Sequence, residues 1–138
     1  MTGVYPHSLD AKGRLFIPAK LRDELGEVFY VTLSMEKCLT AYSSEGWKAL
    51  EEKIKAMPRS KQIQMRPLFA HAAKCELDAQ GRILLPAALR DFAGLKKNVT
   101  VVGDGDVAEF WDTDTWNEID VIETTPENLA KVFTALDF

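Results

Sequence analysis

The chain has 138 residues, of which 46% are hydrophobic and 28% charged, and this ordinary globular composition excludes a disordered chain and predicts one domain over residues 1–138. Its apolar runs are too short to span a membrane and its N-terminus lacks the regions of a signal peptide, so we expect a cytoplasmic protein without a membrane partner. The net charge of −4 is uneven: residues 1–66 hold 11 Lys and Arg against 8 Asp and Glu, whereas residues 67–138 hold 6 against 13. Any polyanion is therefore expected to bind the first half.

Two short strands around a tight turn are predicted at the start of the chain. Residues 4–9 and 14–17 precede and follow a segment in which Asp10 can accept hydrogen bonds from turn amides and Gly13 supplies a positive φ. We expect these two strands to form a β-hairpin.

A short helix and two further strands follow. Residues 19–25 place apolar side chains four positions apart and precede Gly26, a residue type favoured just after a helix. Residues 29–33 and 39–42 are β-rich runs on either side of a turn. The predicted unit is β-β-α-β-β.

Two connector helices are predicted next. Ser44 can cap the first helix, which Pro58 ends, and Ser60 can cap the second. Pro67 predicts a kink or a restart before the second half of the chain. The apolar face of the first helix consists of Trp47, Leu50, Ile54 and Met57.

The β-β-α-β-β unit is repeated 68 positions later. The first copy covers residues 3–46 and the second covers residues 74–117. Two copies are too few for a solenoid, so we expect a single pseudo-twofold domain in which neither copy buries its apolar face alone. The identical pairs at this offset are Leu9/Leu77, Asp10/Asp78, Ala11/Ala79, Gly13/Gly81, Arg14/Arg82, Pro18/Pro86, Ala19/Ala87, Leu21/Leu89, Arg22/Arg90, Asp23/Asp91, Gly26/Gly94, Val31/Val99 and Thr32/Thr100.

An amphipathic helix is predicted at the C-terminus. Thr125 followed by Pro126 favours a helix start. We expect the helix to dock, and the sequence leaves open whether it docks on its own chain or on a neighbour. Its apolar face consists of Leu129, Val132, Phe133 and Leu136.

Each turn carries an arginine that its own geometry does not require. Arg14 follows Asp10 by four residues, and Arg82 follows Asp78 by the same spacing. The turn needs the carboxylate and the glycine, but it has no need for a guanidinium. Two interpretations remain, an ion-paired scaffold and a contact to a ligand.

The two turns differ in charge. The first turn has Lys12, Arg14, Lys20 and Arg22 around it, whereas the matching positions of the second are Gln80, Arg82, Ala88 and Arg90. The first turn is therefore the better anion binder. A hairpin loop with several cations fits the major groove of DNA, where Arg can pair with guanine and Lys can neutralise phosphates.

Three stretches together resemble the MraZ family of bacterial transcriptional regulators over essentially the whole chain. They read GVYPHSLDAKGRLFIPAKLR, AAKCELDAQGRILLPAALR and GDGDVAEFWD, and they contain the family hallmark, a pair of Asp-x-x-x-Arg motifs. The resemblance implies an α+β fold, a double-split β-barrel made from two tandem AbrB-like swapped-hairpin repeats with connector helices and a C-terminal helix. It also implies closed homo-oligomeric rings, octamers or dodecamers.

The resemblance further implies a function and a set of residues that carry it. Members of the family bind short tandem direct repeats in double-stranded DNA upstream of their own operon, within the cell-division and cell-wall gene cluster, and usually repress it, so we expect a nucleoid-associated regulator. In the first turn we assign base contact to Arg14, phosphate contact to Lys12 and Lys20, and orientation of the arginine to Asp10, with Gly13 forming the turn. Arg82, Asp78 and Gly81 are the second-turn candidates.

Two other functions compete with DNA binding as interpretations of the sequence. The sequence has no nucleophile elbow, phosphate loop, zinc motif or supported Cys/His pair, so we expect neither an enzyme nor a small-molecule substrate. The stronger rival is a structural ring-forming oligomer in which both arginines bridge subunits and DNA affinity is incidental. Salt separates these functions, because DNA binding through several cations collapses between about 50 and 200 mM salt.

The remaining chemically active residues are assigned structural roles. Cys38 and Cys75 are isolated and are expected to be reduced and packed, and no cofactor or metal is predicted. His7 and His71 lack a second ligand at metal spacing. Packing is expected for Trp47, Trp111 and Trp116, and a solvated acidic face for Asp104, Asp106, Glu109, Asp112, Asp114 and Glu118.

Overall fold

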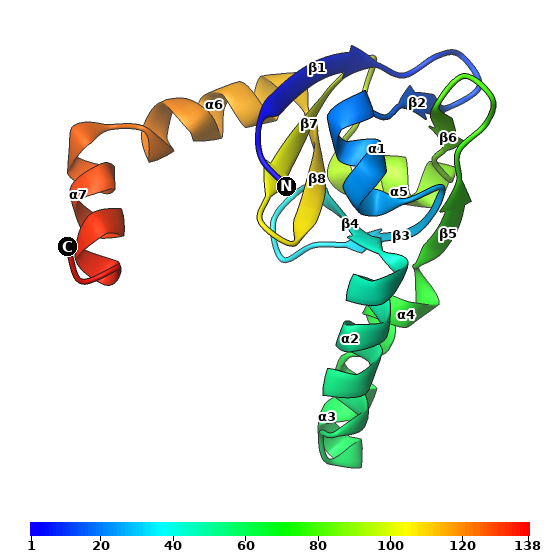
Figure 1. The fold of residues 1–138 in the computed structure, drawn as a ribbon, viewed down its shortest axis with the longest axis horizontal. Helices are drawn as coiled ribbons and strands as arrows, with labels where there is room; N and C mark the ends of the chain where they lie inside the picture. The colour runs from blue at the N-terminus through cyan, green and yellow to red at the C-terminus, as the bar shows by residue number, and fades with distance from the viewer.

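The two copies of the repeat form matching series of elements in the computed structural model, which describes residues 1–138 (Figure 1). The first copy contains β1 (Val4–Ser8), β2 (Arg14–Phe16), α1 (Ala19–Leu25), β3 (Val28–Leu33) and β4 (Leu39–Ser43). The second contains β5 (Ala73–Glu76), β6 (Arg82–Leu84), α5 (Ala87–Ala93), β7 (Asn98–Asp104) and β8 (Val107–Asp112). The connector consists of α2 (Ser44–Lys55), α3 (Arg59–Gln64) and α4 (Arg66–Ala70), and the C-terminal helices are α6 (Thr113–Glu123) and α7 (Pro126–Ala135). The predicted α+β class is confirmed.

The copies interlock because each gives its first strand to the other. The main sheet is antiparallel and has the strand order β1-β7-β8-β4-β3-β5. Strand β1 extends the sheet of the second copy, where His7 lies opposite Val99, and β5 extends that of the first copy, where Cys75 lies opposite Phe29. The order is unchanged when the copies are exchanged, so the sheet has the pseudo-twofold symmetry that the repeat predicts.

The strands around the first turn do not form the local hairpin that we expected. Strand β2 pairs with β6 of the other copy, with Leu15 opposite Ile83, and β1 meets β2 only at an isolated bridge between Leu9 and Leu15. The amide of Leu9 donates a hydrogen bond to the carbonyl of Lys97 at 2.8 Å. The end of the first strand is thus hydrogen-bonded to the other copy. The expected local hairpin is replaced by an exchange of strands between the two copies.

The strand pairing also corrects the alignment of the two copies. His7 and Cys75 are equivalent at offset 68, and their partners are Val99 and Phe29, which are 70 positions apart. The identities Val31/Val99 and Thr32/Thr100 are therefore coincidental, and the extra residues of the second copy lie between Gly94 and β7.

One hydrophobic core of 18 residues is shared by both copies. Its fully or almost fully buried side chains include Leu15, Ile17, Leu21 and Leu25 of the first copy and Ile83, Leu85, Leu89 and Ala93 of the second. Cys38 and Cys75 are buried free thiols, as predicted. Burial raises the pKa of Cys38 to about 12 and that of Cys75 to about 11.

The helix starts and stops follow local hydrogen bonding. Helix α1 ends at Gly26, whose φ of 84° suits glycine, as predicted. The cap of α2 is Ser43 and not Ser44, because Oγ of Ser43 accepts from the amide of Gly46 at 3.0 Å. Oγ of Ser44 instead donates to the carbonyl of Val28 at 3.0 Å.

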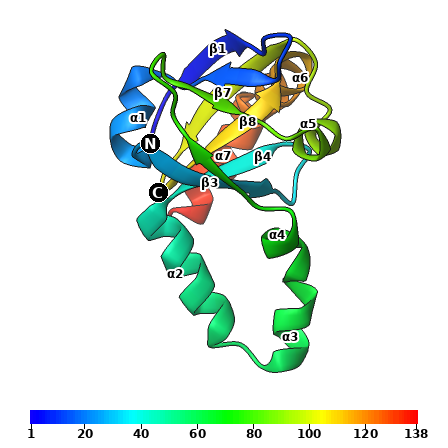
Figure 2. The ribbon, with the colours of Figure 1, turned by 90° about the vertical axis from the view of Figure 1, so that its right-hand side faces the viewer.

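The connector contains three helices where two were expected. Helix α3 begins at Arg59 without a side-chain cap, so the predicted cap at Ser60 is wrong. Pro67 lies in the first turn of α4, as expected for a restart, because the missing proline amide costs nothing there. Figure 2 shows α2 and α3–α4 as the two arms of a hairpin that projects from the sheet.

The C-terminus contains two helices that leave the sheet (Figure 1). Helix α6 is the counterpart of α2 and was not predicted, whereas α7 begins after Thr125 as predicted, with Oγ1 of Thr125 accepting from the amide of Asn128 at 3.2 Å. The predicted apolar face of α7 is not docked on its own chain, since Phe133 and Leu136 are 51% and 61% exposed. None of the seven helices has the length and apolar character required to cross a membrane.

Candidate nucleic-acid interface

The first turn is held by its own carboxylate. Oδ1 of Asp10 accepts hydrogen bonds from the amides of Lys12 and Arg14, both at 2.9 Å, and the amide of Gly13 donates to the carbonyl of Asp10 at 3.0 Å. Gly13 has a φ of 79°, which a side chain would strain. The Asp and Gly positions are therefore explained by the backbone of the turn.

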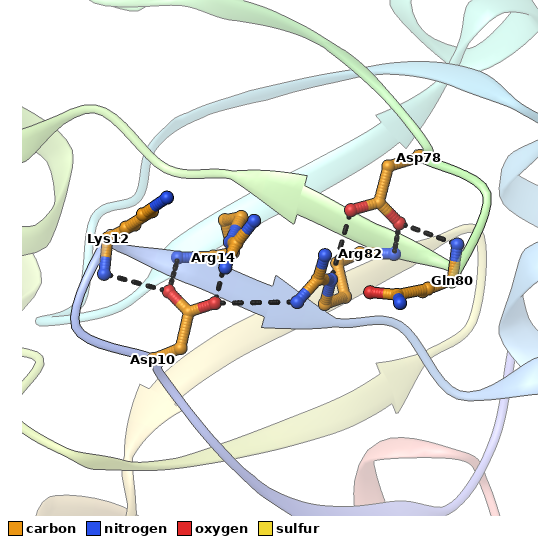
Figure 3. A network of polar contacts seen from close by, with 6 residues as sticks. All are labelled: Asp10, Lys12, Arg14, Asp78, Gln80 and Arg82. Carbon is orange, nitrogen blue, oxygen red and sulfur yellow. Dashed lines mark hydrogen bonds and ion pairs between the residues drawn. The ribbon is translucent and has the colours of Figure 1, made fainter.

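The second turn repeats this geometry. Oδ1 of Asp78 accepts from the amides of Gln80 and Arg82 at 2.9 Å, and Gly81 has a φ of 77°. The two turns lie at opposite ends of the β2–β6 ladder, and the two arginine side chains lie between them (Figure 3). The pseudo-twofold axis thus brings both Asp-x-x-x-Arg motifs into one polar network.

The network is not symmetric, because one carboxylate holds both arginines. Nε of Arg14 lies 2.6 Å from Oδ2 of Asp10, and Nε of Arg82 lies 3.0 Å from Oδ2 of Asp78. Nη1 of Arg82 also lies 3.6 Å from Oδ2 of Asp10, whereas Arg14 makes no matching pair with Asp78. Asp10 is therefore the central acceptor of the network (Figure 3).

Both arginines are tied to carboxylates and still reach solvent. The side chain of Arg14 is 33% exposed and that of Arg82 is 27% exposed. Arg14 uses Nε for its ion pair, and its terminal amino groups have no hydrogen-bond partner in the chain. A guanidinium held in this way has a fixed orientation and a free fork for a bidentate contact.

Two of the candidate cations are exposed lysines, of which Lys12 lies in the first turn and Lys20 lies in α1. Lys12 and Lys20 are exposed and make no ion pair in the chain. Lys12 extends from the tip of the first turn, while Gln80 occupies the matching place in the second (Figure 3). The tip of the first turn therefore carries a positive charge that the tip of the second turn lacks.

The carboxylates of both turns have lowered pKa values. The backbone amide of Arg14 is the largest cause for Asp10, and that of Arg82 is the largest cause for Asp78, because each hydrogen bond favours the charged form. A lowered folded-state pKa stabilises the turns above the ordinary aspartate range, near pH 4, and this contribution is lost as pH falls through the lowered value. Both carboxylates are therefore charged at neutral pH, as the three ion pairs of the network require.

Two further arginines lie beside the turns of the opposite copy. The sequence places Arg22 near the first turn and Arg90 near the second, but the structure reverses this. A β-carbon built on Gly81 would lie 2.4 Å from Nη1 of Arg22, and one built on Gly13 would lie 2.9 Å from Cζ of Arg90. In the sequence, these two residues are marked only by being arginine at matching positions of both copies.

The other candidate residues have structural surroundings. The ring of His7 packs against Phe16 with centroids 5.1 Å apart, and Trp47 stacks on Tyr30 at 5.0 Å. In the acidic stretch, Nε1 of Trp111 donates to Glu109 at 3.1 Å, and burial raises the pKa of that glutamate. No group of three or more His, Cys, Asp or Glu side chains is arranged to hold a metal ion.

The chain matches known proteins over most of its length. Residues 1–66 and 68–132 match the family model described as MraZ protein, antitoxin-like. The chain belongs to the MraZ family. It is 50% identical to the transcriptional regulator MraZ of Carboxydothermus hydrogenoformans over 118 residues, covering 83% of this chain and 82% of that protein. It is 46% identical to the transcriptional regulator MraZ of Heliobacterium modesticaldum over 119 residues, covering 84% and 83%.

One solved structure is also similar, at low likeness. The solution structure of PHS018 from Pyrococcus horikoshii matches with a TM-score of 0.30 and 16% identity, covering 79% of this chain and 86% of that one. A likeness at this level supports no conclusion about function. The assignment to the MraZ family depends on the sequence matches.

Proposed function

We propose that this chain is a transcriptional regulator that binds double-stranded DNA through its first turn. The relatives from Carboxydothermus and Heliobacterium bear the name transcriptional regulator. The observation that carries the proposal is the side chain of Arg14, which is held through Nε by Asp10, has unpaired terminal amino groups and lies in the same turn as the exposed Lys12.

Each residue of the first turn has a proposed role. Arg14 contacts a guanine edge, since a fixed guanidinium fork matches the two acceptors of guanine in the major groove. Lys12 and Lys20 neutralise phosphates, which position the protein without reading sequence. Asp10 orients Arg14, and Gly13 permits the turn. In the second turn Arg82, Asp78 and Gly81 have the same roles, with Gln80 in place of Lys12.

The proposed regulator assembles into a closed ring of identical subunits, an octamer or a dodecamer. Two surfaces support self-association. No residue of α6 or α7 is buried, and residues 113–138 contain six acidic residues and one lysine. The connector holds six Lys and Arg against three Glu over residues 44–70, and it carries a cavity of about 530 Å³ lined in part by Ile54, Ile63 and Phe69. These surfaces are complementary in net charge, and both carry exposed apolar side chains.

A head-to-tail ring determines the arrangement of the DNA sites. Subunits related by rotation present equivalent turns in the same orientation, which fits direct repeats better than a palindrome. Contacts on one face of the duplex recur at about one helical turn, roughly 10 bp. Linkage within one ring raises the effective concentration for each further contact. We propose that the protein is cytoplasmic and nucleoid-associated, binds such repeats upstream of its own operon in the cell-division and cell-wall gene cluster, and represses that operon.

The test compares DNA binding by the wild type, Arg14→Ala and Arg82→Ala. The DNA is the region upstream of the gene, beside a shuffled control, and light scattering follows assembly. A bidentate base contact contributes about 1–3 kcal/mol, so Arg14→Ala should weaken cognate binding about 5- to 150-fold and bring it closer to that of the shuffled control. Unchanged affinity with intact assembly would contradict the role of Arg14.

The rival function is a structural ring with incidental DNA affinity. A salt series on the same DNA separates the two functions. Binding through Lys12, Arg14 and Lys20 should weaken steeply between about 50 and 200 mM salt while the assembly persists. Equal binding to cognate and shuffled DNA at every salt concentration would favour the structural ring.

A further inference from the structure

Arg22 and Arg90 lie in the α-helix of one copy and contact the turn of the other. Arg22 is in α1 and Arg90 is in α5, and both are partly buried. A β-carbon at Gly13 would lie 2.9 Å from Cζ of Arg90 and 3.1 Å from Nη2, and one at Gly81 would lie 2.4 Å from Nη1 of Arg22. A side chain at either glycine would require the guanidinium beside it to move.

Arg90 is also linked to the first turn through the backbone. The amide of Leu85 donates to the carbonyl of Gly13 at 3.0 Å, and the carbonyl of Leu85 accepts from Nε of Arg90 at 3.1 Å. Leu85 follows β6 and belongs to the second copy. Arg90 therefore supports Gly13 in two ways, by direct contact and through this relay.

Arg22 supports the second turn more loosely. The amide of Ile17 donates to the carbonyl of Gly81 at 2.9 Å, which matches the bond from Leu85. Nε of Arg22 is buried and has no hydrogen-bond partner, and its guanidinium lies over the ring of Phe16 at 4.9 Å from the centroid. Arg22 thus lacks the hydrogen bond from Nε to a backbone carbonyl that links Arg90 to the first turn.

We propose that Arg90 is the positioning residue of the first turn and that Arg22 is the weaker positioning residue of the second. Each planar guanidinium fills the space over the glycine of the opposite turn and so determines where the Asp-x-x-x-Arg motif points. The tighter support belongs to the turn with Lys12 and Arg14. The link to DNA rests on the proposed function, whereas the crossed support does not.

Hydrogen exchange by mass spectrometry on the full chain without DNA tests the crossed support. The peptides to follow cover residues 9–16 and 77–84, which contain the turn amides. Lysine keeps the charge but not the planar group, so Arg90→Lys should speed exchange about tenfold in the first peptide and leave the second unchanged, the change expected for one lost hydrogen bond. Arg22→Lys should produce the reverse pattern with a smaller change.

Each outcome decides the proposal. Faster exchange in the turn of the same copy, equal change in both turns, or no change would overturn it. If Arg90→Lys fails to fold, Arg22→Lys decides alone, because its Nε has no hydrogen bond to lose: faster exchange at residues 77–84 and not at 9–16 supports the proposal, and any other result overturns it.

DNA binding by Arg90→Lys is the second measurement. A positioning role predicts a loss of about tenfold in cognate affinity, whereas a direct phosphate contact predicts that lysine preserves affinity. Preserved affinity with faster exchange in the first turn would overturn the link to DNA. If Arg14→Ala binds DNA normally, the proposed function fails, and the exchange pattern of Arg90 still decides the crossed support.

Discussion

At the residue scale, Asp10 and Asp78 have different roles in the polar network. The backbone role of the two carboxylates is the same, since Oδ1 of each accepts two turn amides. Their side-chain roles differ, because Oδ2 of Asp10 contacts both Arg14 and Arg82. The repeat predicts equal roles, and only the cross-strand geometry distinguishes them.

We predict that Asp10→Asn weakens DNA binding more than Asp78→Asn. Asparagine keeps an oxygen for the turn amides but loses the charge that orients the arginines, and both variants remove one negative charge. The difference between them therefore isolates the orienting role, which we expect to reach about tenfold in affinity. Anisotropy titrations on the same duplex measure it, and equal affinities would show that Arg82 does not depend on Asp10.

At the element scale, the predictable features were those determined by neighbours in sequence. Helix α1 and its stop at Gly26 follow from local spacing, and so does the start of α7 at Thr125. Helix α6 was missed because none of its residues is buried, so its apolar pattern is weak. The side chain of Asp112, at the start of α6, does not cap the helix. It accepts a hydrogen bond from the amide of Lys96 at 3.1 Å, in the segment that lengthens the second copy.

The cap of α2 gives the element-scale prediction. Ser43 accepts from the amide of Gly46, and Ser44 bonds to Val28 outside the helix. Ser43→Ala should destabilise the protein by about 1 kcal/mol through loss of the cap. Ser43→Asp is the matched control, since aspartate keeps a side-chain oxygen that can accept from the amide of Gly46. Thermal unfolding compares them, and an equal loss for Ser43→Asp and Ser43→Ala would contradict the assignment of the cap.

At the scale of the whole molecule, the exchange of strands could be derived only in part from the sequence. The duplication predicts that the copies share one core, and the 18-residue cluster contains side chains of both copies. The pairing of β1 with β7 joins residues about a hundred positions apart, and that of β5 with β3 joins residues about fifty apart. No local sequence pattern specifies such partners. The change from offset 68 to offset 70 between β3 and β7 could not be derived from the sequence either, because chance identities at offset 68 hide it.

The exchange implies that neither copy can fold as a monomer by itself. A fragment of residues 1–70 keeps β3 and β4 but lacks β7, β6 and β5, so β1 and β2 lose their partners and β3 loses one neighbour. Its buried Leu15 would lose the contact with Ile83 and become exposed. We predict that fragments 1–70 and 71–138 are each largely unfolded as monomers and that an equimolar mixture recovers the circular dichroism of the intact chain. A cooperatively folded monomer of either fragment, by sedimentation and thermal unfolding, would show that the strand exchange does not stabilise the fold.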